Sequence, residues 1–263
     1  MFDVTVLIRG AGDLATGVAV RLHNSGFRVI MLETSEPTVI RRTVSFAQCV
    51  FDKEYVVEGI KGVMVCCPQK ALEEIEKGNI PVLADSEGKT IDSLHPDVVV
   101  DAILAKKNTG TNKNMAPLTI GLGPGFEAGK DVDYVVETMR GHDLGRVFST
   151  GKALANTGVP GIIGGFGAQR VMHSPADGVF HAVKKISDIV KKGDILGYVD
   201  TAPLIASLDG VLRGILQDGL KVKKGLKMAD IDPRPVQKHC FTVSDKARAL
   251  GGSVLEIICL RFA

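Results

Sequence analysis

The first 33 residues alternate between apolar runs and a helical pattern, as a parallel α/β unit does. Val4–Ile8 is a mostly apolar, β-branched run, which is typical of a strand buried on both faces. Apolar residues then recur every four positions from 14 to 22, which predicts a helix with one apolar face, and Gly26 favours its termination. A second strand is predicted at Phe27–Leu32, ending at Glu33. This order predicts a βαβ opening of a doubly wound sheet.

Further elements follow up to residue 121, and a loop-rich stretch comes after them. The pattern predicts helices at Gln69–Lys77 and Ile91–Leu94, and strands at Val63–Cys66, Ile80–Leu83, Val98–Val100 and Leu118–Gly121. Residues 151–167 are rich in Gly, Asn, Thr and Pro, which favours a domain boundary there. The first domain is therefore predicted to span residues 1–165.

Beyond this boundary the sequence repeats itself with an offset of 32 residues. Asp177-Gly178-Val179 recurs as Asp209-Gly210-Val211, and Val190–Gly193 recurs as Val222–Gly225. Each copy reads as a turn, a short strand, a second strand, another turn and a third strand, which predicts two interlocked β-halves.

Residues 166–232 resemble the barrel-sandwich hybrid of biotinyl and lipoyl domains. Those domains carry a lysine on the hairpin between their halves, whereas Tyr198–Leu204 contains none. We therefore expect no covalently attached cofactor. The predicted fold is an α/β Rossmann-like N-terminal half with an inserted or following small all-β barrel-sandwich hybrid. The tail, residues 233–263, is predicted to pack on the first domain, with a helix at Ser244–Leu250 that Gly251-Gly252 interrupts.

Composition and charge remove several classes of function. The 263 residues carry a net charge of only +2, and no basic run suggests a nucleic-acid-binding face. No signal peptide is visible, and no uncharged apolar stretch approaches the ~18 residues of a membrane span. Five irregularly spaced cysteines favour reduced thiols and a cytoplasmic protein. Homo-oligomerisation is left open.

The glycine turn after the first strand is the main candidate binding site. Gly10-x-Gly12-x-x-Ala15 lies between a predicted strand and a predicted helix, the context of a dinucleotide fingerprint. Glycines let the main chain approach a pyrophosphate, and free N–H groups at a helix start attract its charge. Glu33 stands where an acid binds a ribose hydroxyl, which favours NAD over NADP. The predicted cofactor-binding residues here are Gly10, Ala11, Gly12, Asp13, Leu14 and Glu33.

Asp13 and Gly17 count against this interpretation. A carboxylate in the first turn already satisfies the helix dipole and repels a phosphate. The alternative is that Gly10 and Gly12 only form a tight turn between strand and helix.

Two further segments are candidate walls of the same pocket. Arg41 and Arg42 could clamp a phosphate bidentately, although exposed loop arginines are common. Gly121, Gly123 and Gly125 form a second glycine-rich turn after a strand, where open α/β sheets place their ligands, or else a plain loop.

No strong catalytic or metal motif is present. His239 and Cys240 are neighbours that point apart on an extended chain. Cys66-Cys67 lacks the spacing of a zinc loop. His142, in a polar loop, is a weak acid–base candidate. The catalytic residues are therefore left unassigned, no metal site is predicted, and whether the chain is an enzyme stays open.

Several segments together resemble one family, the accessory proteins of the selenium-dependent molybdenum hydroxylase system, the YqeB group. They are Leu7–Gly17, Arg41–Ala47, Ile120–Phe126, Glu137–His142, Asn156–Gly161 and His239–Ala247. The resemblance spans nearly the whole chain. It implies a role in maturing a molybdenum hydroxylase, with that enzyme as partner, and supplies no known reaction.

Three functions are therefore considered. The first is a maturation factor that binds a nucleotide or the molybdenum cofactor, for which a molybdopterin dinucleotide would suit a pyrophosphate-binding crevice. The second is an NAD-dependent oxidoreductase. The third is a non-catalytic scaffold in which the glycines serve only the fold.

Overall fold

The computed structural model describes residues 2–156, 158 and 161–262, and the chain divides into two compact units. Unit 1 comprises residues 1–37, 45–157 and 243–263, and unit 2 comprises residues 38–44 and 158–242. Part of the Asn156–Gly161 segment, namely Thr157, Val159 and Pro160, lies outside the described residues. No helix in the described ranges is both long and apolar enough to cross a lipid bilayer.

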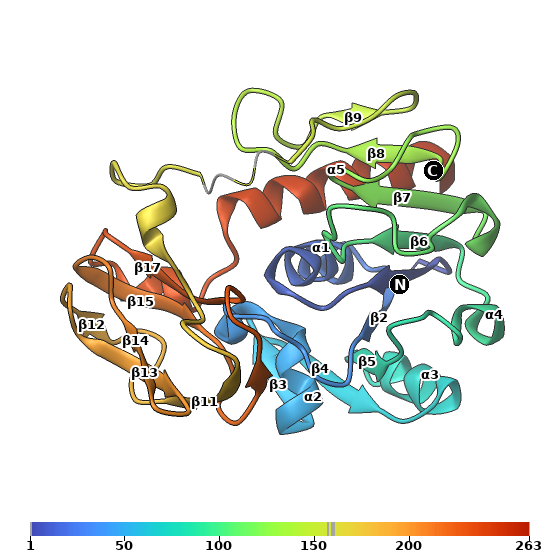
Figure 1. The fold of residues 1–263 in the computed structure, drawn as a ribbon. Coiled ribbons are helices and arrows are strands. Elements are labelled where there is room, and N and C mark those ends of the chain that lie inside the picture. The colour runs from blue at the N-terminus through green and yellow to red at the C-terminus, as the bar shows by residue number, and fades with distance from the viewer. Residues whose placement is uncertain (1, 157, 159–160, 263) are drawn as a thin grey trace. The chain divides into compact units, whose positions relative to one another are not determined.

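Unit 1 is built on a nine-stranded sheet with strand order β3-β4-β5-β2-β1-β6-β7-β8-β9 (Figure 1). The seven inner strands run parallel to one another, namely β4, β5, β2, β1, β6, β7 and β8. The two edge strands, β3 and β9, are antiparallel to their neighbours. The strands are β1 Thr5–Arg9, β2 Arg28–Glu33, β3 Glu54–Val57, β4 Ile60–Val65, β5 Ile80–Ala84, β6 Val98–Asp101, β7 Leu118–Leu122, β8 Tyr134–Val136 and β9 Val147–Phe148. The helices are α1 Asp13–Asn24, α2 Cys49–Asp52, α3 Pro68–Glu76, α4 Ile91–Leu94 and α5 Asp245–Phe262.

The central strands are buried because their residues are apolar on both faces. β1, β2 and β6 have almost no exposed side chain between them, as expected for parallel strands covered on two sides. One core cluster joins Leu7, Ile30 and Val99 of these strands to Ala71 and Ile75 of α3. The amphipathic pattern of α3 therefore closes this part of the sheet.

The prediction of a Rossmann-like half was wrong. Unit 1 is a mixed sheet with antiparallel strands at both edges, and in the described chain no α-helix crosses between β6 and β7 or between β7 and β8. Instead α5, from the far end of the sequence, contacts β7, β8 and α1 (Figure 1). A local βαβ pattern cannot reveal a covering helix that comes from more than 100 residues away in the chain.

The helix α5 also continues through the predicted break at Gly251-Gly252. A Cβ at Gly251 would lie 3.0 Å from the carbonyl oxygen of Gly17 and 2.8 Å from Cβ of Arg21, both on α1. Gly251 thus permits a close helix–helix contact, and the helix hydrogen bonds outweigh the low helix propensity of two glycines.

Unit 2 contains two four-stranded antiparallel sheets, β10-β17-β15-β12 and β14-β13-β11-β16. The strands are β10 Val171–His173, β11 Gly178–Ala182, β12 Ile189–Val190, β13 Ile195–Val199, β14 Ala202–Ile205, β15 Gly210–Ile215, β16 Lys221–Val222 and β17 Lys227–Asp232. The remaining short elements of the chain are 3-10 turns at Arg42–Val44, Phe46–Gln48, Lys113–Met115, Ala168–Arg170 and Gln237–Cys240.

The 32-residue offset of the sequence recurs in the strand positions of unit 2. β15, β16 and β17 each begin 32 residues after β11, β12 and β13, and each sheet combines strands of both copies. The prediction of a barrel-sandwich hybrid was nevertheless wrong, because the strands form two separate sheets, each with edge strands. Turn spacing predicts the strands, but whether a small sheet closes depends on side-chain packing that the spacing does not encode.

Buried charge is concentrated in one sheet of unit 2. Asp230 accepts hydrogen bonds from Arg170 at 2.6 Å and from Arg213 at 2.7 Å, and Asp232 pairs with Arg234 at 2.7 Å. The guanidinium groups hold the pKa of the Asp232 carboxyl below its usual range against the opposing effect of burial. These ion pairs join β15 and β17 to the segment before β10.

Candidate functional site

The glycine turn after β1 is closed by the chain's own acceptors. The Gly10 N–H donates to the carbonyl of Leu32 at 2.7 Å, and the Ala11 N–H donates to Oε2 of Glu33 at 2.9 Å. The other carboxylate oxygen of Glu33 accepts from the Thr34 N–H at 2.7 Å. Glu33 therefore accepts hydrogen bonds from the main chain around the turn. The sequence had suggested that this carboxylate binds a ribose hydroxyl.

Burial raises the pKa of the Glu33 carboxyl, and the hydrogen bonds from Thr34 and Ala11 oppose that rise. Gly12 is the N-cap of α1, its carbonyl accepts from the Thr16 N–H at 2.8 Å, and Asp13 and Leu14 form the first turn of the helix. These six predicted residues thus lie together at the carboxyl ends of β1 and β2. Their role in binding a cofactor stays a prediction.

The space beside Gly10 is filled by the main chain that follows β6. A Cβ at Gly10 would lie 2.9 Å from the carbonyl oxygen of Ala102 and 3.2 Å from Cα of Ile103, and the Gly10 φ of +99° disfavours other residues. β1 and β6 are the neighbours at which the strand order reverses, where ligands of open α/β sheets bind. The missing side chain of Gly10 leaves room for the main chain of Ala102 and Ile103.

The second glycine turn is also packed by its own chain. A Cβ at Gly121 would meet the ring of Phe126 at 2.5 Å, and one at Gly123 would meet Oγ1 of Thr138 at 2.5 Å. A Cβ at Gly125 would lie 2.9 Å from backbone atoms of Lys107. At all three positions a Cβ would collide with neighbouring atoms of unit 1, so glycine is needed for the packing there.

Arg41 and Arg42 belong to unit 2 and bind acceptors of that unit. Arg41 is buried and donates to the carbonyl of His239 at 2.8 Å. Arg42 donates to the carbonyl of Ile215 at 2.9 Å and to Oε1 of Gln217 at 3.0 Å. These contacts attach the segment 38–44 to the rest of unit 2.

A buried polar cluster lies at the ends of β1 and β6. Arg9 donates to Thr111, Thr111 donates to Asp101 at 2.6 Å, and the Arg9 guanidinium lies 3.7 Å from Asp101. Burial raises the pKa of the Asp101 carboxyl, and the hydrogen bond from Thr111 opposes the rise. This cluster is closed, because both charged side chains are almost fully buried.

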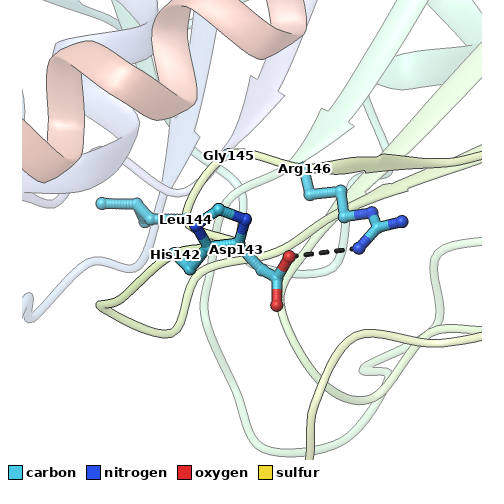
Figure 2. Close-up of a pocket in the computed structure, with 5 residues that line it drawn as sticks. All are labelled: His142, Asp143, Leu144, Gly145 and Arg146. Atoms are coloured by element: carbon cyan, nitrogen blue, oxygen red, sulfur yellow. Dashed lines mark hydrogen bonds and ion pairs between the residues drawn. The ribbon is translucent and has the colours of Figure 1, made fainter.

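The loop between β8 and β9 forms an open pocket of about 500 Å³, lined by His142, Asp143, Leu144, Gly145 and Arg146 (Figure 2). The loop is a hairpin connection, in which the Glu137 N–H donates to the Arg146 carbonyl and the Gly145 N–H donates to the Glu137 carbonyl, both at 2.9 Å. The buried Glu137 carboxylate accepts from the N–H groups of Met139 at 2.7 Å and Leu154 at 2.8 Å. The base of the loop is therefore well ordered by hydrogen bonds.

Side chains of helix α5 make hydrogen bonds to the same loop. Ser253 donates to the Gly145 carbonyl at 2.6 Å, and Arg140 makes two hydrogen bonds of 2.8 and 2.9 Å to the Asp245 carboxylate. The Arg140 guanidinium lowers the pKa of Asp245 well below its usual range. This bidentate pair fixes the loop just before His142.

Two charged side chains that line the pocket pair with each other. The Arg146 guanidinium lies 3.1 Å from the Asp143 carboxylate (Figure 2). Its Cζ lies 5.8 Å from the centre of the Phe148 ring, a cation–π contact. Sequence reasoning named only His142 from this loop. The signal for Arg146 was its place after two glycines in Gly141–Arg146, but the flanking hairpin strands β8 and β9 were not predicted.

The remaining sequence candidates are placed as follows. His239 and Cys240 lie in a 3-10 turn of unit 2, and burial raises the pKa of the Cys240 thiol. Cys66 and Cys67 follow β4 with their sulfurs 3.8 Å apart. Across the described residues, no three His, Cys, Asp or Glu side chains gather closely enough to hold a metal ion.

No protein-family model matches the chain. It is 51% identical over 255 residues to the uncharacterized protein YqeB of Escherichia coli (strain K12), an alignment that covers 97% of this chain and 47% of that protein. The chain thus spans about half the length of the curated relative it matches. The resemblance to YqeB is supported, and no role in a molybdenum hydroxylase system is shown.

Solved structures with detectable similarity are remote. They include an aspartoacylase family protein of Mesorhizobium loti, at 11% identity and a TM-score of 0.26, which covers 87% of this chain and 84% of that one. A succinylglutamate desuccinylase/aspartoacylase of Rhodobacter sphaeroides has 15% identity and a TM-score of 0.27 over the same shares. The ectoine utilization protein EutE of Ruegeria pomeroyi has 12% identity and a TM-score of 0.27, over 87% and 85%. At these scores the likeness carries no argument about this chain.

The predicted function, a molybdenum hydroxylase maturation factor that binds a nucleotide in a Rossmann crevice, was wrong. Its premise was an open crevice at the first glycine turn, and the turn is instead engaged by Glu33 and by the backbone at Ala102. The names of the compared proteins contain neither molybdenum nor selenium. They lend no support to the oxidoreductase or scaffold alternatives either.

Proposed function

We propose that this chain binds a small anionic molecule, a carboxylate or a phosphate, in the pocket formed by residues 142–146. The observation that carries the proposal is the placement of Arg146. Its guanidinium lines a pocket of about 500 Å³ and lies against the Phe148 ring. A planar guanidinium suits bidentate binding of carboxylate or phosphate oxygens.

A ligand can replace Asp143 as the partner of Arg146. Asp143 and Arg146 form an ion pair whose side chains are 42% and 64% exposed. Exposed pairs of this kind contribute only about 0–1 kcal/mol. An anion with two oxygens can therefore take the place of Asp143 at little cost.

The loop is ordered before any ligand arrives. Hydrogen bonds to Glu137 at its base and from Ser253 of α5 hold its backbone. A preorganised site loses less conformational entropy on binding, which favours affinity. The pocket also follows the carboxyl end of β8, the side of an α/β sheet on which ligands usually bind.

His142 is the second donor in the pocket. It is exposed and lies next to Asp143 on the same loop. An imidazole N–H can donate to an anion oxygen that Arg146 does not reach. The proposal therefore assigns charge recognition to Arg146 and an additional hydrogen bond to His142.

Isothermal titration of the full chain with inorganic phosphate, and separately with succinate, tests the proposal and distinguishes its two ligand classes. We expect saturable binding of one of them, weakened about 10- to 100-fold in R146Q, because a hydrogen bond to a charged group contributes about 1.5–3 kcal/mol. D143N should bind more tightly, since the competing carboxylate is gone.

The matched control is R28Q, which removes an arginine of unit 1 that pairs with exposed Asp3 at 2.7 Å, far from this loop in the sequence. It changes the net charge by the same amount as R146Q and should bind like the unaltered chain. No saturable binding of either anion, or equal weakening in R28Q and R146Q, would overturn the proposal.

A further inference from the structure

Two adjacent thiols lie at the carboxyl end of β4, separate from the pocket of residues 142–146. Cys66 is exposed, Cys67 is partly exposed, and their sulfurs are 3.8 Å apart. β4 runs parallel to β5, so the pair lies at the edge of the sheet where the parallel strands end. Both thiols are accessible to a small molecule from solvent.

Cys67 is also the N-cap of α3, a helix of nine residues with Pro68 in its first position. The backbone N–H of Lys70, the neighbouring Cys66 thiol and the N–H of Gln69 together lower the pKa of the Cys67 thiol, and the Lys70 ammonium adds to the effect. A thiolate is the nucleophilic form of cysteine, and the start of a helix stabilises it. The two sulfurs are therefore unequal, with Cys67 the better nucleophile.

We propose that Cys66 and Cys67 form a dithiol site that exchanges with low-molecular-weight disulfides, in which Cys67 attacks and Cys66 resolves. The juxtaposition of two accessible sulfurs, one of them at a helix start, carries this inference. It does not depend on the anion pocket, which uses other residues.

The reaction has two steps. The Cys67 thiolate attacks one sulfur of a disulfide R–S–S–R, which forms a Cys67–S–S–R bond and releases R–S⁻. The Cys66 thiol then loses its proton to water, and its thiolate attacks the Cys67 sulfur and expels the second R–S⁻. Two protein thiols are oxidised to one disulfide, and R–S–S–R is reduced to two thiols after protonation.

The disulfide between Cys66 and Cys67 is easily reduced again. Neighbouring Cα atoms across a trans peptide are about 3.8 Å apart, which is less than the roughly 4.4–6.8 Å that disulfides usually span. A bond between Cys66 and Cys67 is therefore strained, and strained, exposed disulfides are readily reduced. The site consequently suits reversible exchange and adds no lasting crosslink to the fold.

The other cysteines provide internal comparisons. Cys49 and Cys240 are buried, and burial raises the pKa of Cys49 to about 12. Cys259 is exposed near the carboxyl end of α5. It is the matched control, because it is an exposed thiol on a helix and does not stand at the helix start.

The test uses the reduced full chain and bis(2-hydroxyethyl) disulfide at pH 7, with acid quenching and peptide mass spectrometry. In the unaltered chain we expect the peptide with Cys66 and Cys67 to lose two hydrogens and to retain no adduct. C66S should retain one hydroxyethylthio group on Cys67. C67S should react at Cys66 at least about fivefold more slowly, because it lacks the favoured thiolate.

A second measurement identifies the attacking sulfur. In C66S, alkylation of Cys67 by iodoacetamide should be at least about fivefold faster at pH 7 than that of Cys259. Equal rates for the two cysteines would overturn the assignment of Cys67. A stable adduct on the unaltered pair would overturn the resolving role of Cys66.

Discussion

Gly17 of α1 lies directly against Ala247 of α5, so that a Cβ at Gly17 would come within 2.5 Å of the Ala247 Cβ and 3.0 Å of its carbonyl carbon. Both positions are buried. The missing side chain lets the two helices approach closely, and it is this contact that explains a glycine in the middle of α1.

We predict that G17A destabilises the protein by about 1–3 kcal/mol, because a methyl group there overpacks a tight helix interface. The loss should occur although alanine favours helices over glycine by about 1 kcal/mol. Unfolding of the full chain in urea measures the effect.

The matched control is G252A, on α5 itself. A Cβ at Gly252 meets nothing within 4 Å, so this substitution should be neutral or stabilise by up to about 1 kcal/mol. If G17A were as stable as G252A, the close approach of α1 and α5 at Gly17 would be refuted.

The repeat of unit 2 offers a second matched pair, Gly178 and Gly210. Their backbones are alike, with φ of 154° and 159°, but a Cβ at Gly178 would contact the Asp200 carboxylate whereas one at Gly210 would contact the backbone oxygen of Asp232. Asp200 and Asp232 are themselves 32 residues apart.

G210A is expected to be the more destabilising substitution, by about 2–3 kcal/mol, because backbone cannot move aside without disturbing the sheet. In G178A the Asp200 side chain can rotate away, at the cost of about 1 kcal/mol for its hydrogen bond from the Val179 N–H, in addition to the backbone strain at positive φ that both substitutions share. Thermal unfolding of the two variants would compare them directly. Equal losses would show that the contact partner does not decide the cost.

Glu33 makes stability depend on pH. Its pKa in the folded chain is raised above the ordinary 4.5, chiefly by burial. An acid with a raised folded pKa contributes most to stability below its unfolded pKa, and the contribution is lost as pH rises through the folded value. We therefore expect the unaltered chain to lose stability relative to E33Q between about pH 4 and pH 7.

Urea unfolding of both proteins at several pH values in that range measures the difference. E33Q changes the hydrogen bonds to Ala11 and Thr34 as well, but that cost is independent of pH and shifts all values equally. The raised pKa of Asp101 is common to both proteins and cancels. A difference in unfolding free energy that does not vary with pH would contradict the burial of an ionised Glu33.

Many individual elements could be predicted from the sequence. The strand predicted at Val98–Val100 is β6, the helix predicted at Ile91–Leu94 is α4, and the 32-residue offset recurs in the strands of unit 2. These signals are local: alternation, apolar runs and turn residues depend on neighbours within a few positions. The weakly patterned strands β3 and β9 at the sheet edges, and β8 next to β9, were missed.

The candidate site could be predicted only in part. The sequence placed Gly10 and Glu33 at adjacent strand ends, which the structure confirms, but the Glu33 carboxylate is hydrogen-bonded to Ala11 within the turn. It named His142 but missed Arg146, because the Phe148 and Asp143 contacts exist only once β8 and β9 pair.

The sequence by itself determined the secondary structure of the sheet core, the repeat, and the supply of glycines at tight positions. Only the tertiary structure decided what each glycine approaches: Ala102 at Gly10, α5 at Gly17, and the backbone of Asp232 at Gly210. The physical reason is that a glycine's freedom is a local property, whereas the atoms that use the space come from segments tens to hundreds of residues away.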